Sequence, residues 1–333
     1  MATQNLTRAS RELTASTHPQ SPVSLPALIA AGGKTAAGRF LEFFAADIRN
    51  PHTRRAYFRA CAEFLGWCEQ QKIRSLQEVG PVVIAAYVES LLRRPSRTHE
   101  ATSTKPTAKQ ALAAIRRLFD YLVLGHIVHT NPALSVRGPR HSTAKGRTSP
   151  LDCDQVRELF ASIDASQLAG KRDRALIAVM AYGFARIGAV VRMRVQDYVQ
   201  RGKRWHLRLH EKNGKVIDLP AHHTAEMYLD DYIAAAGICD QRKGPLFRSM
   251  DRWGRMSTSG LTENDAFRMV RRRAVAAGLP GTTGNHTFRA TSATTYLANG
   301  GKLEHAQRMM GHSDPRTTKM YDHTSDRLTL AGC

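Results

Sequence analysis

The sequence predicts a mainly α-helical protein of two domains, the second of which contains a small antiparallel β-hairpin. Three observations support this fold class. The 333 residues suffice for about two domains of ~150 residues each. Apolar residues recur at the helical spacings of 3 and 4 over most of the chain. The clear exception is a pair of alternating runs around Asn213–Gly214, a dipeptide that is typical of hairpin turns.

The first part of the chain is expected to be a tail followed by an all-helical domain. Residues 1–33 are rich in Ser, Thr, Ala and Pro and show weak periodicity, which predicts a disordered N-terminal tail. The helical domain is expected over 34–135. Its helices are RFLEFFAADIR, NPHTRRAYFRACAEFLGWCEQQ, PVVIAAYVESLLRR and TAKQALAAIRRLFDYLVLGHIV. Asn50 or Thr53 can cap the second of them.

A basic linker is expected to join the two domains over 136–149. The segment NPALSVRGPRHSTAKGRTSP contains three prolines and two glycines but no acidic residue. The second domain is expected over 150–327 and opens as a helix, with Ser149 as its N-cap and Pro150 as its first residue. Residues 328–333 are assigned to a C-terminal tail.

The second domain is predicted to return to helices after its hairpin. The apolar helix KRDRALIAVMAYGF precedes the strands WHLRL and KVIDLP, which alternate polar and apolar residues. Further helices are expected at 223–236, 262–278, 287–299 and 302–310. A last helix is expected to start near Pro315 and to include Tyr321.

The charge of the chain indicates its kind of partner. The net charge is +21. Residues 1–146 contain 20 basic and 9 acidic side chains, and the remainder contains 29 and 19. Because both halves are basic, a polyanion lying between two basic domains is the simplest interpretation. A generally basic soluble protein is the alternative on charge alone.

Other features argue against a membrane protein and against a metal site. The chain has no apolar run of about 18 residues, and its N-terminus has no apolar core of a secretory signal. The five cysteines are odd in number and form no CxxC pair, and the fourteen histidines show no ligand spacing. We therefore expect a cytoplasmic protein with no cofactor and no bound metal.

Two segments contain cationic side chains at positions that a purely structural role does not readily explain. In AYGFARIGAVV, Arg186 enters an apolar helix with no acid within three residues, so it needs an anionic partner or extends its charge to solvent. In HEKNGK, Lys212 and Lys215 lie at the hairpin tip. A lysine at such a tip is usually solvated, but a mobile tip can also deliver an ammonium group into a groove.

Two further segments add histidines, an arginine and a tyrosine. In GNHTFRATS, His286 and Arg289 lie one helical turn apart and can face the same phosphate. In GHSDPRTTKMY, His312 precedes Tyr321 by nine residues. A tyrosine in such a place is more often a packing residue. Taken together, the two arginines, two histidines, lysine and tyrosine favour phosphodiester transfer with a tyrosine nucleophile.

The order Arg, Lys, HxxR, GH, Tyr resembles that of the tyrosine recombinases, also called phage-type integrases. The motifs of that family resemble TGLRISEL, GKGNK or EKGGK, HxLRHT, LGHSS and TTxxYTH. This chain has YGFARIGAV, HEKNGK, HTFRAT, MGHSD and TTKMYDH. Upstream, NPHTRRAYFRACAEFLGWC looks like the core-binding domain of the family, so the resemblance covers roughly 36–330. It implies a two-domain DNA clamp made of a helical, SAM-like core-binding domain and a catalytic domain.

The resemblance also implies roles for the phosphate-binding groups. Tyr321 would attack the scissile phosphate, form a 3′-phosphotyrosyl bond and release a 5′-hydroxyl. Arg186 and Arg289 would bind the non-bridging oxygens. The chain departs from the family pattern in two places near the first arginine. Ala185 replaces a leucine, and Ala189 replaces the acid that normally supports the arginine.

The remaining roles follow from the same resemblance. Lys212 would give a proton to the leaving 5′-oxygen, with Lys215 as a rival. His286 would manage the proton of the tyrosine, and His312 would hydrogen-bond the phosphate. The implied partners are double-stranded DNA with an inverted-repeat core site and three further copies in a tetramer on two DNA sites, or a related second recombinase. Leu328 and Leu330 are candidates for docking on a neighbouring subunit.

The resemblance implies a site-specific recombinase of the bacterial nucleoid, of the Xer-like or mobile-element kind. Three alternatives stay open at this point. A catalytically silent DNA-binding protein of the same fold would have no reason to keep all six polar groups. A type IB topoisomerase shares the chemistry but lacks the integrase-like helical domain. An RNA-binding module would need aromatic stacking platforms, whereas aromatic residues make up only 7% of the chain.

Overall fold

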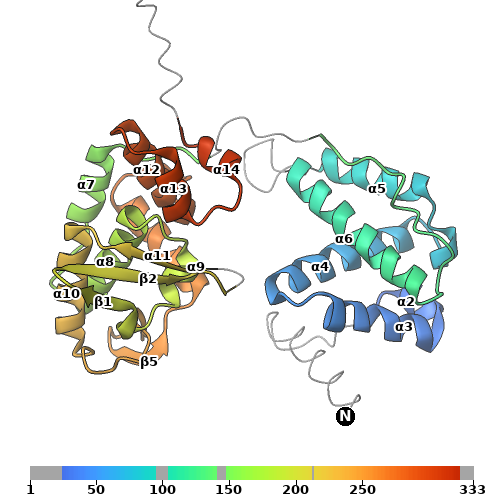
Figure 1. Cartoon of the computed structure of the whole chain (residues 1–333). Coiled ribbons are helices and arrows are strands. Elements are labelled where there is room, and N and C mark those ends of the chain that lie inside the picture. The colour runs from blue at the N-terminus through green and yellow to red at the C-terminus, as the bar shows by residue number, and fades with distance from the viewer. Residues whose placement is uncertain (1–24, 95–103, 141–147, 212–213, 323–333) are drawn as a thin grey trace, which may run out of the picture. The chain divides into compact units, whose positions relative to one another are not determined.

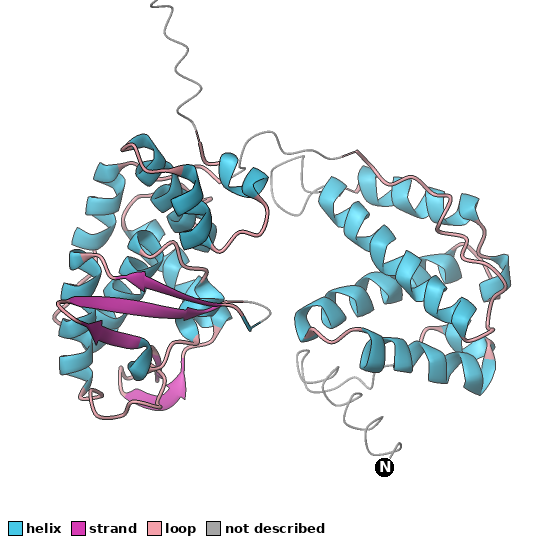
Figure 2. Cartoon of the chain, viewed as in Figure 1, coloured by secondary structure: helices cyan, strands magenta, loops and turns pink. Residues whose placement is uncertain are grey.

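The computed structural model of the protein is mainly helical, with two small antiparallel sheets (Figures 1 and 2). It describes residues 25–94, 104–140, 148–211 and 214–322. The chain divides into two compact units, Met1–Ser142 and Thr143–Cys333. Each unit has its own apolar core, and the predicted fold class is confirmed.

The described part of the first unit consists of helices. They are α2 (Ala27–Ala31), α3 (Gly33–Glu42), the π-helical turn η1 (Phe43–Asp47), α4 (Pro51–Gln70), the 3₁₀ turn η2 (Leu76–Glu78), α5 (Pro81–Arg93) and α6 (Thr104–Leu124). The side chain of Asn50 caps α4 by accepting a hydrogen bond from the His52 amide at 2.9 Å. The predicted apolar face of α4 is buried in the core of this unit through Cys61, Phe64, Leu65 and Cys68.

The helical unit begins earlier than the sequence predicts. The predicted tail covers residues 1–33, but α2 lies within it, with Leu28 only 2% exposed and Ile29 fully buried. The Ala27 amide also donates to the Glu69 carboxylate of α4 at 2.6 Å. A helix of five residues is too short to give a periodic signal, so its burial against α4 stabilises what the local sequence does not reveal. Residues 1–24 of the predicted tail lie outside the described residues.

The second unit packs helices around a buried central helix and a three-stranded sheet. Its elements are α7 (Cys153–Ala161), α8 (Leu168–Tyr182), α9 (Ile187–Val191), η3 (Val195–Asp197), β1 (Tyr198–Arg201), β2 (Arg204–His210), β3 (Val216–Pro220), α10 (His223–Ala236), β4 (Arg248–Met250), β5 (Met256–Gly260), α11 (Glu263–Ala276), α12 (Asn285–Ala298), α13 (Leu303–Met310) and α14 (Pro315–Lys319). Helices α10 and α12 both pack on α8. Helix α8 is buried on all sides from Ala175 to Ala181, as expected for a helix that is apolar all round.

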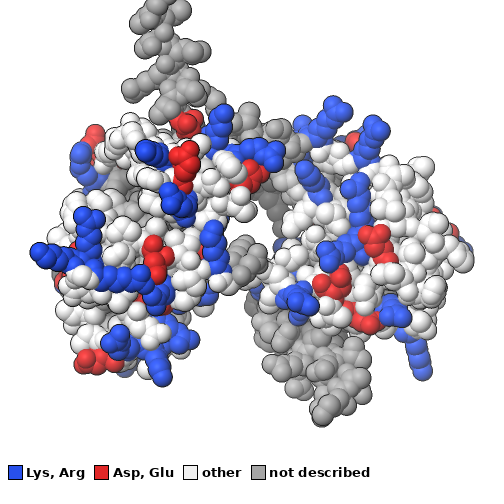
Figure 3. All heavy atoms as spheres, viewed as in Figure 1, with Lys and Arg blue, Asp and Glu red and all other residues white. Residues whose placement is uncertain are grey.

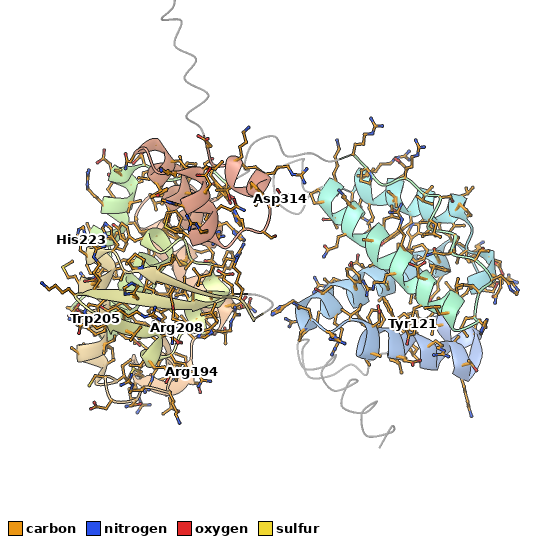
Figure 4. The ribbon with its side chains drawn as sticks, in the orientation of Figure 1. Tyr121, Arg194, Trp205, Arg208, His223 and Asp314 are labelled. Atoms are coloured by element: carbon orange, nitrogen blue, oxygen red, sulfur yellow. The ribbon has the colours of Figure 1, made fainter. Side chains whose placement is uncertain are left out.

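The predicted hairpin is confirmed as β2 and β3, which pair in antiparallel register. Leu207 lies opposite Leu219 on the buried face, while Arg208 pairs with Asp218 on the other face at 3.1 Å. Arg208 and Trp205 are both labelled on β2 in Figure 4. Strand β1, which the sequence did not predict, extends the sheet to the order β1-β2-β3, and β4 pairs with β5 separately. The tip residues 212–213 lie outside the described residues.

Two predicted helix limits in this unit are wrong. Helix α7 begins at Cys153 rather than at 150, because Asp152 and Gln155 form a capping box there. Helix α14 starts at Pro315 behind its cap Asp314 (Figure 4) and ends at Lys319, so Tyr321 does not lie on it. The Tyr321 amide instead donates to the Thr318 carbonyl at 3.0 Å in a tight turn.

Basic side chains outnumber acidic ones on the face of each unit that Figure 3 shows. This matches the even spread of the +21 net charge over both halves of the sequence. Within the described ranges, no helix has both the length and the apolar character needed to cross a bilayer.

A buried ionic cluster joins α8 to α11. Asp173 accepts hydrogen bonds from the Arg172 guanidinium at 2.7 Å and from the Arg273 guanidinium at 2.8 Å. The side chains of Asp173 and Arg172 are 3% and 7% exposed. Arg172 also donates to the Arg248 carbonyl of β4 at 2.9 Å. This cluster therefore ties two helices and a strand together around a carboxylate that is almost fully buried.

We predict that Asp173→Ala lowers the free energy of unfolding by about 3 kcal/mol or more, because it leaves a buried arginine without its counter-charge. Asp154→Ala is the matched control. Asp154 pairs with Arg157, but both side chains are more than 75% exposed, so a change within about 0.5 kcal/mol is expected. Guanidinium-induced unfolding followed by circular dichroism measures both variants. Equal small losses would contradict a structural role of the cluster.

Candidate active site

Arg289 is the centre of the candidate site. It lies on the second turn of α12 and is only 3% exposed. Its guanidinium donates to the carbonyl of Phe184 through Nη1 and to the carbonyl of Met310 through Nη2. Nη2 also lies 3.0 Å from Nε2 of His312. One buried cation thus joins α12, the turn before α9 and the end of α13, and α12, α13 and α14 lie together in Figure 1.

Both carbonyls that bind Arg289 lie at or next to a residue with left-handed backbone. Phe184 adopts the left-handed conformation with φ of 52°, which costs a non-glycine residue about 1–2 kcal/mol. Gly311 follows Met310, caps α13 and has φ of 63°. A Cβ atom on Gly311 would also lie 2.5 Å from the end of Ile217. The backbone is therefore shaped at both places so that carbonyl oxygens meet the guanidinium.

His312 is held as a neutral imidazole with a defined tautomer. A guanidinium only donates hydrogen bonds, so Nε2 of His312 accepts from Arg289. Nδ1 then has the proton and donates to Oγ1 of Thr318 at 2.9 Å. Burial, reinforced by the charges of Arg289 and Arg186, lowers the pKa of His312 to about 4. The hydrogen bonds and the pKa direction agree that His312 is uncharged at neutral pH.

Thr318 connects His312 to Tyr321. Its side chain is fully buried, its hydroxyl accepts from His312, and its carbonyl accepts from the Tyr321 amide. The Tyr321 ring lies parallel to the His312 ring, with centroids 6.4 Å apart. Tyr321 also packs against a small apolar cluster of Phe184, Ala293 and Met310. The tyrosine is therefore fixed beside the histidine although it lies past the end of α14.

Arg186 has an anionic partner from a distant segment, which is one of the two alternatives that the sequence left open. Nη1 of Arg186 donates to Oε2 of Glu211 at 2.6 Å. Glu211 directly follows β2, and its side chain is 5% exposed, compared with 33% for Arg186. The guanidinium is thus anchored at one side by a buried carboxylate while a third of its side chain faces solvent.

The pKa of Arg289 shows that these groups share one electrostatic field. The pKa of Arg289 is lowered to about 10, mainly by burial and also by the positive charge of Arg186. The charges of Glu211 and Tyr321 act in the opposite direction. Arg289 nonetheless stays charged at neutral pH. Two arginines beside a neutral histidine and a phenol make a site that is suited to an anion with a reactive centre between them.

Of the two hairpin lysines, only Lys215 belongs to the described residues. Lys215 lies close to the candidate site, because its Nζ is 3.7 Å from the position of a Cβ on Gly311 and its charge contributes to the low pKa of His312. Lys212 lies outside the described residues. His286 is on the first turn of α12 and is exposed, one turn before the buried Arg289.

Three residues of the site were missed by the sequence analysis. Glu211 and Thr318 stand inside the motifs HEKNGK and TTKMYDH, next to residues that were selected, so their positions were within reach. Phe184 gives no sequence signal for its left-handed backbone, because an aromatic residue rarely adopts this conformation.

Comparisons with known proteins show which family the chain resembles. The model of the phage integrase family matches residues 150–327, and that of the phage integrase N-terminal SAM-like domain matches residues 38–125. Tyrosine recombinase XerC of Chlamydia pneumoniae is 30% identical over 230 residues, covering 69% of this chain and 71% of that protein. Tyrosine recombinase XerC of Chlamydia caviae is 28% identical over 229 residues, covering 69% and 71%.

Solved structures share the fold at low sequence identity. The XerH site-specific recombinase bound to a palindromic difH substrate has a TM-score of 0.65 at 17% identity, covering 96% of this chain and 92% of that one. A lambda integrase dimer bound to a COC′ core site, comprising residues 75–356 of that protein, has a TM-score of 0.64 at 16% identity, covering 87% and 95%. The matched family model spans more than half of the sequence, and this chain belongs to the phage integrase family.

Proposed function

We propose that this protein is a tyrosine-type site-specific DNA recombinase that cuts and rejoins DNA through a 3′-phosphotyrosyl intermediate. The observation that supports this best is the placement of Tyr321 beside His312, next to the buried Arg289. The phenol oxygen attacks the phosphorus, the Tyr321–phosphate bond forms, and the bond to the 5′-oxygen breaks. The energy of the phosphodiester is kept in the new bond, so a 5′-hydroxyl of another strand can reverse the step.

Arg289 and Arg186 are proposed to bind the non-bridging oxygens of the scissile phosphate. Arg289 is fixed by two carbonyls and Arg186 by a carboxylate, so neither guanidinium has to be ordered at the moment of reaction. Preorganised donors of this kind each contribute about 10²–10³ in rate to comparable reactions. The geometry therefore supports charge stabilisation as the main contribution of these two residues.

The proton transfers are assigned to the remaining polar groups. His286 takes the proton of the Tyr321 hydroxyl, and a hairpin lysine, Lys212 or Lys215, protonates the leaving 5′-oxygen. His312 is neutral in the free protein. The negative charge of a bound phosphate raises the pKa of this imidazole, so that His312 can donate a hydrogen bond to the phosphate.

The proposed partner is double-stranded DNA with an inverted-repeat core site, bound by four copies of this chain or by two copies with a related second recombinase. Among the structural relatives, XerH is bound to a palindromic difH substrate, and a lambda integrase tetramer is bound to a Holliday junction. The basic charge of both units supports such a partner. We place the protein at the nucleoid in the cytoplasm of a bacterium and favour a mobile-element integrase over chromosome resolution.

The nucleophile is tested with nicked duplexes that are tiled across the DNA flanking the gene and trap the cleaved state. Wild type is expected to form an SDS-resistant protein–DNA adduct with EDTA present, whereas Tyr321→Phe forms none because it has no hydroxyl to attack. Tyr296→Phe is the matched control, since Tyr296 packs in the same apolar cluster, and it should keep the adduct. An adduct that survives Tyr321→Phe would exclude this tyrosine. Tight binding by every variant without any adduct would indicate a silent DNA-binding protein.

The lysine that acts as the general acid is identified by changing the leaving group of the cleavage reaction. We expect that one of the variants Lys212→Ala and Lys215→Ala slows cleavage of an ordinary duplex by about 10²-fold or more, because the 5′-alkoxide then leaves without a proton. The same variant should cleave at nearly the wild-type rate when sulfur replaces the bridging 5′-oxygen, since a thiolate leaves without help. If neither defect is rescued by sulfur, the hairpin lysines do not act as the acid.

The pKa of His312 predicts a pH dependence of stability. The unfolded chain binds a proton on this histidine below about 6.5, whereas the folded protein binds it only below about 4. Stability therefore falls as the pH falls from about 6.5 to 4, and it is unaffected by this group above 6.5. His312→Gln should lose less stability than wild type between pH 7 and pH 5 in denaturant titrations. Parallel losses in the two proteins would contradict a buried neutral imidazole.

A further inference from the structure

The carboxylate of Glu211 is buried in a site whose two arginines are otherwise suited to bind an anion. The Glu211 side chain is 5% exposed and accepts from Nη1 of Arg186 at 2.6 Å. A buried carboxylate without a counter-charge is strongly destabilising, so Glu211 and Arg186 depend on each other. Since an acid beside a phosphate-binding arginine also competes with the phosphate, its presence requires an explanation other than attraction of the substrate.

The segment around Arg186 supplies no acid of its own. Arg186 precedes α9, and the position one turn later is Ala189, which is fully buried and has no polar side chain. Glu211 reaches the guanidinium from 25 residues further along the chain, at the end of β2. The anchoring charge is therefore provided by the sheet instead of by the helix that follows the arginine.

Glu211 also balances the charges of the site. Burial is the main cause of the lowered pKa of Arg289, and repulsion by the guanidinium of Arg186 adds to it, whereas the charge of Glu211 opposes this repulsion. Without the carboxylate, Arg186, whose side chain is 33% exposed, can move into solvent to escape the second guanidinium. The bond to Glu211 uses one of the five N–H donors of Arg186, so further donors can serve a phosphate.

The backbone of Glu211 fixes where its carboxylate lies. Its amide donates to the carbonyl of Lys215 at 2.7 Å, across the tip of the hairpin. The position of the carboxylate is thereby coupled to the segment that approaches His312 with Lys215. A displacement of the hairpin would move the anchor of Arg186 at the same time.

We propose that Glu211 is a positioning residue for strand cleavage, which holds Arg186 in place to receive the scissile phosphate and offsets its repulsion from Arg289. This inference rests on the proposed recombinase function. Glu211 does not touch the DNA; it acts through Arg186. The role differs from a purely structural one because its effect must depend on the charge of the scissile phosphate.

The test uses Glu211→Gln, which keeps the shape of the side chain and removes its charge. Adduct formation on the nicked duplex is expected to slow by about 10-fold to 100-fold, which is less than the loss of about 10²–10³ that follows removal of a preorganised donor itself, because Arg186 is still present. On a duplex with an uncharged methylphosphonate at the scissile position, the loss should shrink to less than about threefold, because less charge needs stabilisation there. Glu263→Gln is the matched control, since Glu263 pairs with Arg192 in an exposed ion pair of 3.2 Å.

A variant with both Arg186 and Glu211 replaced distinguishes a loss of positioning from a folding defect. If Glu211 acts through Arg186, Arg186→Ala combined with Glu211→Gln should be no slower than Arg186→Ala alone. Additive losses, or an equal loss of Glu211→Gln on phosphate and methylphosphonate, would overturn the proposal. Wild-type activity of Glu211→Gln would do the same. Failure of the wild-type protein to form an adduct on any duplex would instead refute the proposed function.

Discussion

The burial of the Arg289 guanidinium is the constraint on which the rest of the site depends. A cation that is 3% exposed has to find acceptors inside the protein, and it finds the carbonyls of Phe184 and Met310. Inside a continuing helix both carbonyls would accept backbone hydrogen bonds instead. Phe184 has to adopt a left-handed backbone, and α13 has to end at Gly311. The arginine therefore determines where two segments turn, and both turns lead directly to other residues of the site.

The same guanidinium determines the state of His312. Because Arg289 donates to Nε2, the proton of the imidazole is on Nδ1, and Nδ1 in turn orients Thr318. Thr318 then receives the Tyr321 amide on its carbonyl. Tyr321 is thus placed by a series of hydrogen bonds that starts at a buried cation, rather than by a long helix. A short helix and a turn leave the tyrosine with few regular backbone bonds of its own, and its position depends on this series.

The sequence predicted the parts of the fold that repeat and missed those that depend on distant contacts. The apolar periodicity of α4 and α8 and the polar–apolar alternation of β2 and β3 are local signals, and these helices and strands were correctly predicted. Strand β1 and helix α2 have four and five residues, and each is stabilised by a partner that lies elsewhere in the chain. Local propensity gives no information about such partners. The limits of α7 were misjudged because the capping box at Asp152 outcompeted Ser149 and Pro150.

The candidate site shows the same division. Local residue chemistry and the resemblance of the motifs to a known family selected Arg186, Arg289, His312 and Tyr321, and the described structure brings these four together. Elementary electrostatics also required either an anion or exposure to solvent for Arg186, but nothing near it in the sequence could reveal that Glu211 would supply the anion. That pairing exists only because β2 ends beside the turn before α9.

The buried carboxylate of Glu211 also makes Arg186 different from the surface cations of the chain, because it gives Arg186 a fixed partner. With a net charge of +21, the protein attracts a polyanion over much of its surface, and such attraction does not depend on the position of any single side chain. Stabilising a transition state requires charges that are already in place, which surface arginines on long side chains are not. In our proposal, Glu211 offsets part of the positive charge around Arg186 and holds its guanidinium in place. A protein with an excess of positive charge therefore gains more at the reacting phosphate from a fixed arginine than from an additional one.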